Sequence, residues 1–406
     1  MIFCDCVKYS VRNRIAFLQL HTIIVCAILI QHIWGAVFTA EIIPIEFCIE
    51  FQPDPGNADG GKIMFKSSIK FIPFILLILA VFSGCSKKAA DESRLKEVVV
   101  YTYDSFVSEW GAGPEIEKLF EEKTGLELTF VDCGDAVQVL SRAVLEKNDV
   151  QADVILGLDN NIAQKAEKAG ILVSYKPTDA DKIISDEIRL QLGKNWTLTP
   201  YDYSHFAMIY DTLSDVPCPK SLEDLLNPVY EKKIILMDPR TSTPGLGFVT
   251  WTAAIYGDKT ADYWKALKPN ILTMAPGWSS GYGLFKKGEA PLVISYTTSP
   301  ASHIEYDSTD RYIAPVFEQG HPVQVEGAGI LKGAKNRKGA EMFIDFLISE
   351  EAQSVMPLTQ WMNPVNKAVA LPACYEQAAP IPSKTLAVDP AVLDKTVDEI
   401  MKILEN

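Results

Sequence analysis

Residues 98–131 read VVVYTYDSFVSEWGAGPEIEKLFEEKTGLELTFV, which contains the parts of one strand–helix–strand unit. The β-branched and aromatic residues 98–103 predict a strand. A glycine-rich break follows, and Pro114 suits the first turn of the next helix. Residues 126–131 predict the second strand. A helix between two consecutive strands is typical of a parallel sheet.

The same alternation continues along the chain and indicates a sheet with helices on both faces. Further strands or extended segments are predicted over 153–158, 206–210, 233–237, 291–296, 312–316 and 323–331. Further helices are predicted over 136–147, 162–169, 222–226, 247–256, 261–265 and 340–348.

The pattern restarts after residue 206 without a long polar linker, which predicts an α/β protein of two lobes, each a mainly parallel sheet flanked by helices. We expect lobe 1 to comprise residues 98–200 and 301–355, and lobe 2 residues 201–300 and 356–406. The hinge is expected at the crossings near 200–204 and Ser299.

The composition of the 406 residues is that of a globular protein, with 48% hydrophobic and 22% charged residues. It excludes a collagenous, low-complexity or wholly disordered chain. The formal net charge is −14. Such a surface repels phosphate backbones, so nucleic acid is not an expected partner.

Residues 64–85, MFKSSIKFIPFILLILAVFSGC, follow the plan of a secretory signal peptide. The apolar run 71–82 is shorter than the roughly 20 residues that span a bilayer. The small-small-Cys ending resembles a bacterial lipobox, so we expect lipidation of Cys85 and a polar tether over 86–97. An ordinary signal peptide or a retained membrane anchor is the alternative.

Residues 1–63 precede this signal, and we expect them to be translated upstream sequence or a disordered extension. A real transmembrane segment near 14–37 is the alternative. The part after Cys85 holds three further cysteines, Cys133, Cys218 and Cys374. Their wide spacing and the absence of a CxxC pair argue against a zinc or redox motif, and leave open whether any two form a disulfide.

Catalytic and metal-binding motifs are not found after residue 85. The three histidines there are His205, His303 and His321, and they show none of the HxH, HxxxH or HExxH spacings of metal sites. No GxSxG motif is present either. The sequence therefore predicts no metal ligands and no catalytic residues.

Aromatic and hydroxyl residues cluster where predicted strands end. In α/β sheets, ligands bind beyond the carboxyl ends of parallel strands. The clusters are YTYDSFVSEWGAGP (101–114), DPRTSTPGLG (238–247), PGWSSGYG (276–283), SYTTSP (295–300) and QWMNP (360–364). Aromatic faces attract cations and flat rings, and backbone N–H groups at a helix start favour an anion such as phosphate. Taken singly, each cluster also fits a turn or a capping loop.

Read together, these phrases resemble the thiamine-binding proteins of bacterial thiamine ABC transporters, from about Val98 to beyond Trp361. The matching phrases are YTYDSF (101–106), ADVILGLDNN (152–161), DPRTSTPGLG (238–247), GW (277–278), YGLF (282–285) and SYTTSPA (295–301). The resemblance implies the two-lobed type II periplasmic binding protein fold. It also implies a monomeric, non-enzymatic extracytoplasmic receptor that binds thiamine or a thiamine phosphate, uses no cofactor and delivers its ligand to an inner-membrane ABC permease.

The resemblance also implies roles for individual residues. Thiamine carries a cationic thiazolium ring, a flat aminopyrimidine and a hydroxyethyl arm. The aromatic faces for the rings would come from Tyr103, Trp110, Trp278 and Tyr296. The cation or amine would meet Asp135, beside Ala136. The hydroxyl or phosphate end would meet Ser242, Thr243, Thr297, Thr298, Ser299 and Pro300. Trp361 would help to close the cleft.

Two other functions stay open. Thiamine-degrading enzymes share this type of fold and use a cysteine nucleophile, for which Cys133 is the candidate. A receptor for another ligand, such as ferric ion, is the second alternative, although ferric receptors of this fold use paired tyrosines and no Tyr-Tyr pair occurs here. Ser302 stands where the thiamine-binding relatives usually carry Tyr, which leaves the preference among thiamine and its phosphates open.

Overall fold

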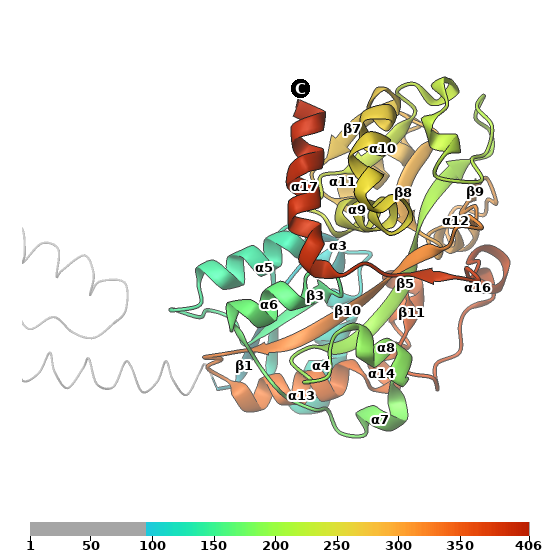
Figure 1. The fold of residues 1–406 in the computed structure, drawn as a ribbon. Coiled ribbons are helices and arrows are strands. Elements are labelled where there is room, and N and C mark those ends of the chain that lie inside the picture. Colours follow the sequence, from blue (N-terminus) through green and yellow to red (C-terminus); the bar gives the residue numbers. More distant parts are fainter. Residues whose placement is uncertain (1–94, 406) are drawn as a thin grey trace, which may run out of the picture. The chain divides into compact units, whose positions relative to one another are not determined.

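The computed structural model describes residues 95–405 (Figure 1). The predictions for the extension, the signal peptide and Cys85, and for most of the tether, lie outside the described residues. Within 95–405, no helix combines the length and the apolar character needed to cross a membrane.

The first lobe contains the strand–helix–strand units that the sequence predicts. Strand β1 (Glu97–Thr102) pairs in parallel with β2 (Glu127–Asp132) and with β3 (Val154–Asp159). Helices α4 (Gly113–Thr124) and α5 (Ala136–Leu145) connect these strands, and α6 (Ala163–Ala169) follows β3. Helices α4 and α6 each end at a glycine in the left-handed conformation, Gly125 and Gly170, which stops a helix without strain.

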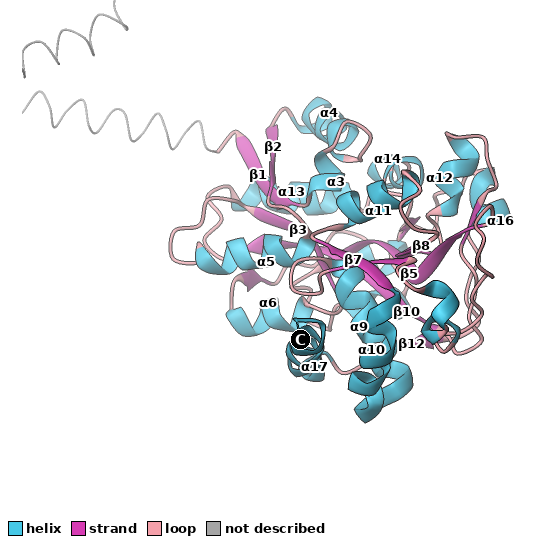
Figure 2. Cartoon of the chain, turned by 90° about the horizontal axis from the view of Figure 1, so that it is seen from above, coloured by secondary structure: helices cyan, strands magenta, loops and turns pink. Residues whose placement is uncertain are grey.

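The second lobe repeats this plan. Strand β6 (Ile234–Met237) pairs in parallel with β7 (Ile271–Ala275) and with β8 (Leu292–Tyr296). Helices α9 (Thr243–Tyr256), α10 (Thr260–Leu267) and α11 (Trp278–Lys286) surround these strands. Figure 2 shows the helices on both sides of the sheet, as predicted for each lobe.

Two long antiparallel strands connect the lobes. Strands β5 (Thr199–Asp211) and β10 (His321–Leu331) pair with each other, β10 also pairs with β3, and β5 also pairs with β8. The strand order is therefore β2-β1-β3-β10-β5-β8-β6-β7, and Figure 1 shows β5 and β10 running through the middle of the molecule. The register shifts at bulges on either side of Gly327. The α/β, two-lobed fold is confirmed, while the predicted residue boundaries of the lobes stay a prediction.

Shorter elements complete the described chain. The remaining strands are β4 (Leu172–Val173), β9 (Tyr312–Ile313), β11 (Asn363–Pro364) and β12 (Thr385–Leu386). The remaining α-helices are α3 (Asp104–Val107), α7 (Ala180–Ile183), α8 (Asp186–Gln191), α12 (Pro300–Glu305), α13 (Arg337–Leu347), α14 (Glu350–Gln353), α15 (Met356–Thr359), α16 (Ala373–Ala378) and α17 (Pro390–Glu405). Short 3₁₀ turns are η1 (Asp224–Leu226), η2 (Pro228–Tyr230), η3 (Gly257–Lys259) and η4 (Lys268–Asn270).

Some local predictions differ from the structure. The segment 276–283, which reads as a loop, forms most of α11, while the predicted helix 222–226 is only the 3₁₀ turn η1. The extended segment 312–316 pairs only at β9. Glycine at Gly281 permits close packing of α11, because a Cβ there would lie 2.5 Å from the Met237 methyl group.

Candidate functional site

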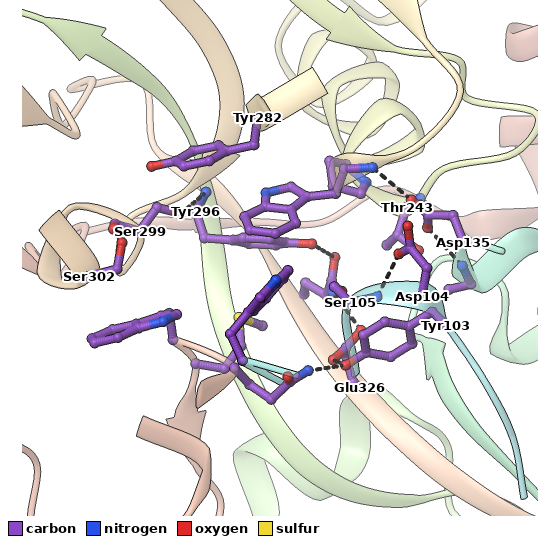
Figure 3. A pocket seen from close by; sticks show the side chains of 18 residues that line it. Tyr103, Asp104, Ser105, Asp135, Thr243, Tyr282, Tyr296, Ser299, Ser302 and Glu326 are labelled. Atoms are coloured by element: carbon purple, nitrogen blue, oxygen red, sulfur yellow. Dashed lines mark hydrogen bonds between the residues drawn. The ribbon is translucent and has the colours of Figure 1, made fainter. Parts of the chain in front are cut away.

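A cavity lies between the two lobes, beside the crossing strands (Figure 3). Its lining comes from the ends of β1 and β8, the starts of α5, α9 and α11, and strand β10. Nine of the residues singled out from the sequence line it: Tyr103, Trp110, Asp135, Ala136, Thr243, Trp278, Tyr296, Ser299 and Trp361. Most of these side chains follow strand ends, as the position of the sequence clusters predicts.

Aromatic rings form one side of this cavity. The Trp278 ring stacks on Tyr282 at 4.9 Å between centroids, and its indole N–H donates to Ser295 Oγ at 2.8 Å. Trp110 lies 6.1 Å from Trp278, with its ring tilted by 55° and half exposed. On the other side, the Tyr296 hydroxyl donates to Gln324 at 3.1 Å. These contacts fix the rings in place and present π faces to the cavity.

Trp361 lines the cavity in a strained backbone conformation. Its φ is +57°, which is uncommon for a bulky side chain. The ring lies edge-on to Tyr306 and parallel to Tyr375. Its neighbour Gln360 donates to the Tyr103 hydroxyl at 2.7 Å and accepts from the backbone N–H of Ala112. The segment 360–362 is thereby attached to the first lobe.

The Asp135 carboxylate lies at the N-termini of three helices. Within its own lobe it caps α5 and accepts from the N–H of Ala136 at 2.7 Å. From the other lobe it accepts the N–H of Thr243, the first residue of α9, and the N–H of Trp278, the first residue of α11, both at 3.1 Å. Burial raises the pKa of this carboxyl, and the hydrogen bonds that it accepts oppose that rise. Asp135 therefore connects the lobes directly.

The hydroxyl groups predicted to meet the ligand differ in their hydrogen-bond partners. The Ser242 and Thr243 hydroxyls are buried at the start of α9 without a hydrogen-bond partner of good geometry. The Ser299 hydroxyl is bonded to Ser295 Oγ at 2.8 Å. Ser242, Thr297, Thr298 and Pro300 do not line this cavity, and both threonine hydroxyls instead contact Ser204 on β5. The ligand contacts of all these residues stay a prediction.

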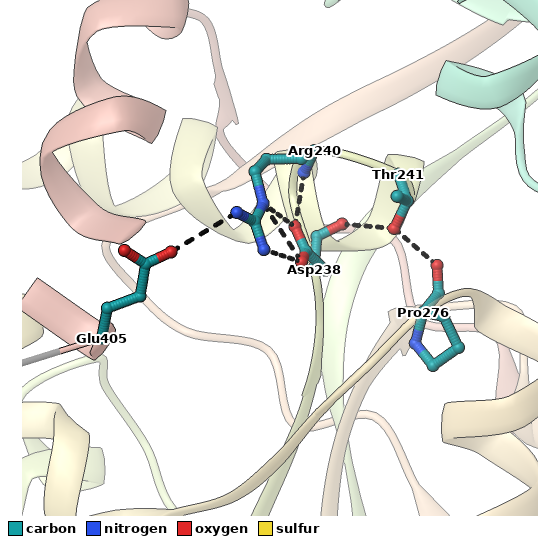
Figure 4. A network of polar contacts seen from close by, with 5 residues as sticks. All are labelled: Asp238, Arg240, Thr241, Pro276 and Glu405. Atoms are coloured by element: carbon teal, nitrogen blue, oxygen red, sulfur yellow. Dashed lines mark hydrogen bonds and ion pairs between the residues drawn. The ribbon is translucent and has the colours of Figure 1, made fainter. Parts of the chain in front are cut away.

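The one cationic side chain of the loop before α9, Arg240, is not part of the cavity lining and joins a network of polar contacts (Figure 4). The Arg240 guanidinium forms a bidentate pair with the Asp238 carboxylate. Its Nη1 atom lies 3.6 Å from Oε1 of Glu405 in α17. Thr241 donates to the carbonyl of Pro276, which holds this loop against the start of α11. From this loop and the start of α9, only Thr243 and Pro244 line the cavity, and no positive side chain does.

Sequence reasoning missed an acidic residue in the lining. Glu326 lies in the middle of β10, is 5% exposed, and accepts from the hydroxyls of Tyr103 and Tyr201 at 2.9 Å each. A lone glutamate in the otherwise uncharged strand sequence HPVQVEGAGIL was the available signal, because buried carboxylates are rare without a partner. Other lining residues not singled out as binding residues are Asp104, Ser105, Pro244, Tyr282, Ser302, Gln324, Gln360 and Met362.

Cys133 lies away from this cavity. Its thiol is half-buried between the Val131 carbonyl and Arg142, and it is absent from the lining. Burial raises the pKa of the thiol, although Arg142 opposes the rise. Cys133, Cys218 and Cys374 are all free thiols.

The fold and this interlobe cavity define a ligand receptor of the solute-binding class, in which two α/β lobes enclose a small molecule. Residues 104–354 match the bacterial extracellular solute-binding protein family. The chain belongs to that family.

Several relatives within this class have names that include a ligand. The thiamine-binding periplasmic protein of Brucella abortus is 40% identical over 78% of this chain and 92% of its own. That of Escherichia coli K12 is also 40% identical, over 72% and 88%. The solved structure of a periplasmic thiamin binding protein superposes with a TM-score of 0.72 at 38% identity, covering 76% of this chain and 96% of that one.

Proposed function

We propose that this protein is a non-enzymatic extracytoplasmic receptor that binds thiamine, or a thiamine phosphate, and delivers it to an ABC permease for import. The lining of the cavity is best suited to a flat, cationic heterocycle. The family assignment supports a receptor of this class, and the relatives named above support thiamine as the ligand.

One observation carries the proposal. The cavity combines aromatic faces with three carboxyl groups, Asp104, Asp135 and Glu326, and none of its lining residues within 95–405 is Lys, Arg or His. Cations are attracted to both carboxylates and aromatic faces, whereas an anionic ligand lacks a positive side chain here. The Thr243 hydroxyl, on a residue of the cavity lining and without a hydrogen-bond partner in the described structure, supplies a hydrogen bond for the polar arm of the ligand.

A binding role rather than a degrading one is supported by the position of Cys133. A cysteine nucleophile must reach the substrate and needs a nearby base or a lowered pKa. Cys133 is outside the cavity lining, and burial raises its pKa. The sequence also lacks the Tyr-Tyr pair that a ferric receptor of this fold would use.

The receptor is proposed to be a monomer outside the cytoplasm, attached to a membrane by a lipid on Cys85. The lipobox-like ending of residues 64–85 supports the anchor. The location is supported by the relatives, which are periplasmic proteins. Mass spectrometry of the protein from native membranes, with a diacylglyceryl cysteine at residue 85 as its first residue, would test both.

Calorimetric titration tests the ligand. The full-length chain, purified in mild detergent and refolded from denaturant to remove bound ligand, is titrated with thiamine and with its mono- and diphosphate. We expect one-to-one binding of at least one of the three, with thiamine recovered unchanged after incubation. The absence of binding to all three would refute thiamine as the ligand, and cleaved thiamine would refute the non-enzymatic role.

A further inference from the structure

Two carboxyl groups lie side by side where the long strands cross. Asp202 of β5 and Glu326 of β10 are register partners, directly beside the bulge at Gly327. Asp202 is fully buried and Glu326 is 5% exposed. Glu326 faces the cavity, close to the Tyr103 ring (Figure 3), whereas Asp202 is not part of the lining. The pair therefore joins the binding site to the strands that connect the lobes.

Neutral donors hold the Glu326 carboxylate. One oxygen accepts from the hydroxyls of Tyr103 and Tyr201, and the other accepts from the side-chain amide of Gln324 at 3.0 Å. Among the described residues, none that lines the cavity around Glu326 is lysine, arginine or histidine. A buried carboxylate without a cation is costly, so this arrangement favours a positive ligand.

The other two acids of the lining are already supported. The Asp135 oxygens accept three backbone N–H groups at helix N-termini, where an anion is stabilised. Asp104 accepts the N–H of Ser105 at 2.6 Å. Of the three acids that line the cavity, Glu326 alone accepts no backbone N–H within the described residues. A bound cation would therefore stabilise its ionised form the most.

Burial dominates the titration of this pair. It raises the pKa of Glu326 to about 7, and the side-chain hydrogen bonds to Asp202, and then to Tyr103 and Tyr201, oppose the rise. Burial, and then the nearby Glu326, raise the pKa of Asp202 well above its ordinary value. The titratable or charged groups that face Glu326 are Tyr103 after β1, Asp159 on β3, Tyr201 and Asp202 on β5, Tyr296 on β8 and Asp135 before α5. All are acids, so none neutralises Glu326 by a positive charge.

We propose that Glu326, positioned by Asp202, is the counter-charge of the cationic ring, and that ligand binding releases a proton from this carboxyl pair into solution. The balance is simple: the protonated pair and the cation give the ionised Glu326 beside the cation, and one proton passes to the buffer. The inference rests on the proposed function, because it needs a cationic ligand in this cavity. Because a proton is released, the affinity for the cationic ligand increases with pH until Glu326 is ionised in the free protein.

Proton-linked calorimetry of the full-length protein tests this. Thiamine is titrated between about pH 6 and about pH 8.5, in buffers of different ionisation enthalpy. For the wild type we expect tighter binding at higher pH and a release of about half a proton per ligand near pH 7. Glu326→Gln should bind roughly 10- to 100-fold more weakly at the high end of this range, the equivalent of one to two pKa units, without proton release.

Two further variants make the outcome specific. Glu318→Gln removes a charge from an exposed loop and should behave as the wild type. Asp202→Ala removes the side-chain hydrogen bond by which Asp202 lowers the pKa of Glu326, without changing a residue of the cavity lining, and it should therefore move the midpoint of the pH profile to higher pH. This second variant also tests the inference if Glu326→Gln fails to fold.

A neutral thiamine analogue, with an uncharged ring in place of the thiazolium, completes the experiment. Its affinity should be nearly the same for the wild type and Glu326→Gln. Wild-type binding of thiamine with no proton release, or with an unchanged affinity in Glu326→Gln, would overturn the counter-charge and leave the receptor function standing. No binding of thiamine by the wild type at any pH would overturn both.

Discussion

Replacing Asp135 with asparagine should weaken ligand binding by opening the lobes while leaving each lobe folded. Asn is as good an N-cap as Asp, so α5 keeps its cap. Between the lobes, however, the side-chain amide would place N–H groups against the N–H of Thr243 or of Trp278. The variant therefore loses at least one of two charge-assisted bonds that hold the closed state.

The magnitude follows from these contacts. A hydrogen bond to a charged group contributes about 1.5–3 kcal/mol, and the stabilisation of an anion at a partly buried helix N-terminus contributes up to about 2 kcal/mol. We therefore expect closure to be less favourable by about 3 kcal/mol, which raises the dissociation constant about 100-fold. Calorimetric titration measures the constant, and small-angle scattering with saturating ligand measures the fraction closed.

The matched control is Asp132→Asn. Asp132 is the last residue of β2, three residues before Asp135, is exposed, and accepts a hydrogen bond only from the nearby N–H of Gly134 in the described structure. This variant should bind as the wild type. An Asp135→Asn variant that binds within about threefold of the wild type, with an unchanged scattering profile, would refute the reasoning that this carboxylate connects the lobes.

Three other outcomes are expected. Trp278→Ala should weaken thiamine binding about 30-fold, since a desolvated cation–π contact is worth about 2 kcal/mol, while Trp278→Phe should retain most of the affinity in the same titration. Cys133→Ser should leave thiamine affinity unchanged, and a complete loss of binding would instead indicate a cysteine at the site. Burial raises the pKa of Asp159 to about 7, so the folded state retains a proton that the unfolded chain has lost, and this acid costs stability as pH rises towards 7. The free energy of unfolding of Asp159→Asn minus that of the wild type, measured in urea, should therefore be about 2 kcal/mol larger at pH 8 than at pH 5.5. A difference that does not change with pH would contradict the raised pKa.

The fold was predictable where the sequence pattern is local. Strand β1 has a run of β-branched residues, and α4 has a proline at its start and a glycine after its end. Helix α11 was not predicted, because its sequence WSSGYGLFK reads as a turn. Tertiary packing favours Gly281 there, since a side chain would meet Met237 on the neighbouring strand. A residue whose reason is a distant contact cannot be interpreted from its sequence neighbours.

The lining of the cavity was likewise predictable only where local sequence position decides it. Trp278 and Tyr296 follow from their positions at the ends of strands, where ligands of such sheets bind. Glu326 could not be predicted in this way, because it lies within a strand and its role depends on tyrosines more than 100 residues away in sequence. The backbone partners of Asp135 were also beyond the sequence, since they exist only when the lobes approach each other.

The continuous strands β5 and β10 have a consequence for the thermodynamics of capture. Both strands pass from one lobe to the other without a loop between them, and they remain paired with each other along the crossing. Movement of the lobes must then bend a hydrogen-bonded ladder, and it orders no segment that was previously free. Ordering of loops is one of the main entropic costs of association. Closure should therefore carry a small conformational entropy change, so that the enthalpy and desolvation of the few cavity contacts decide which molecules are retained.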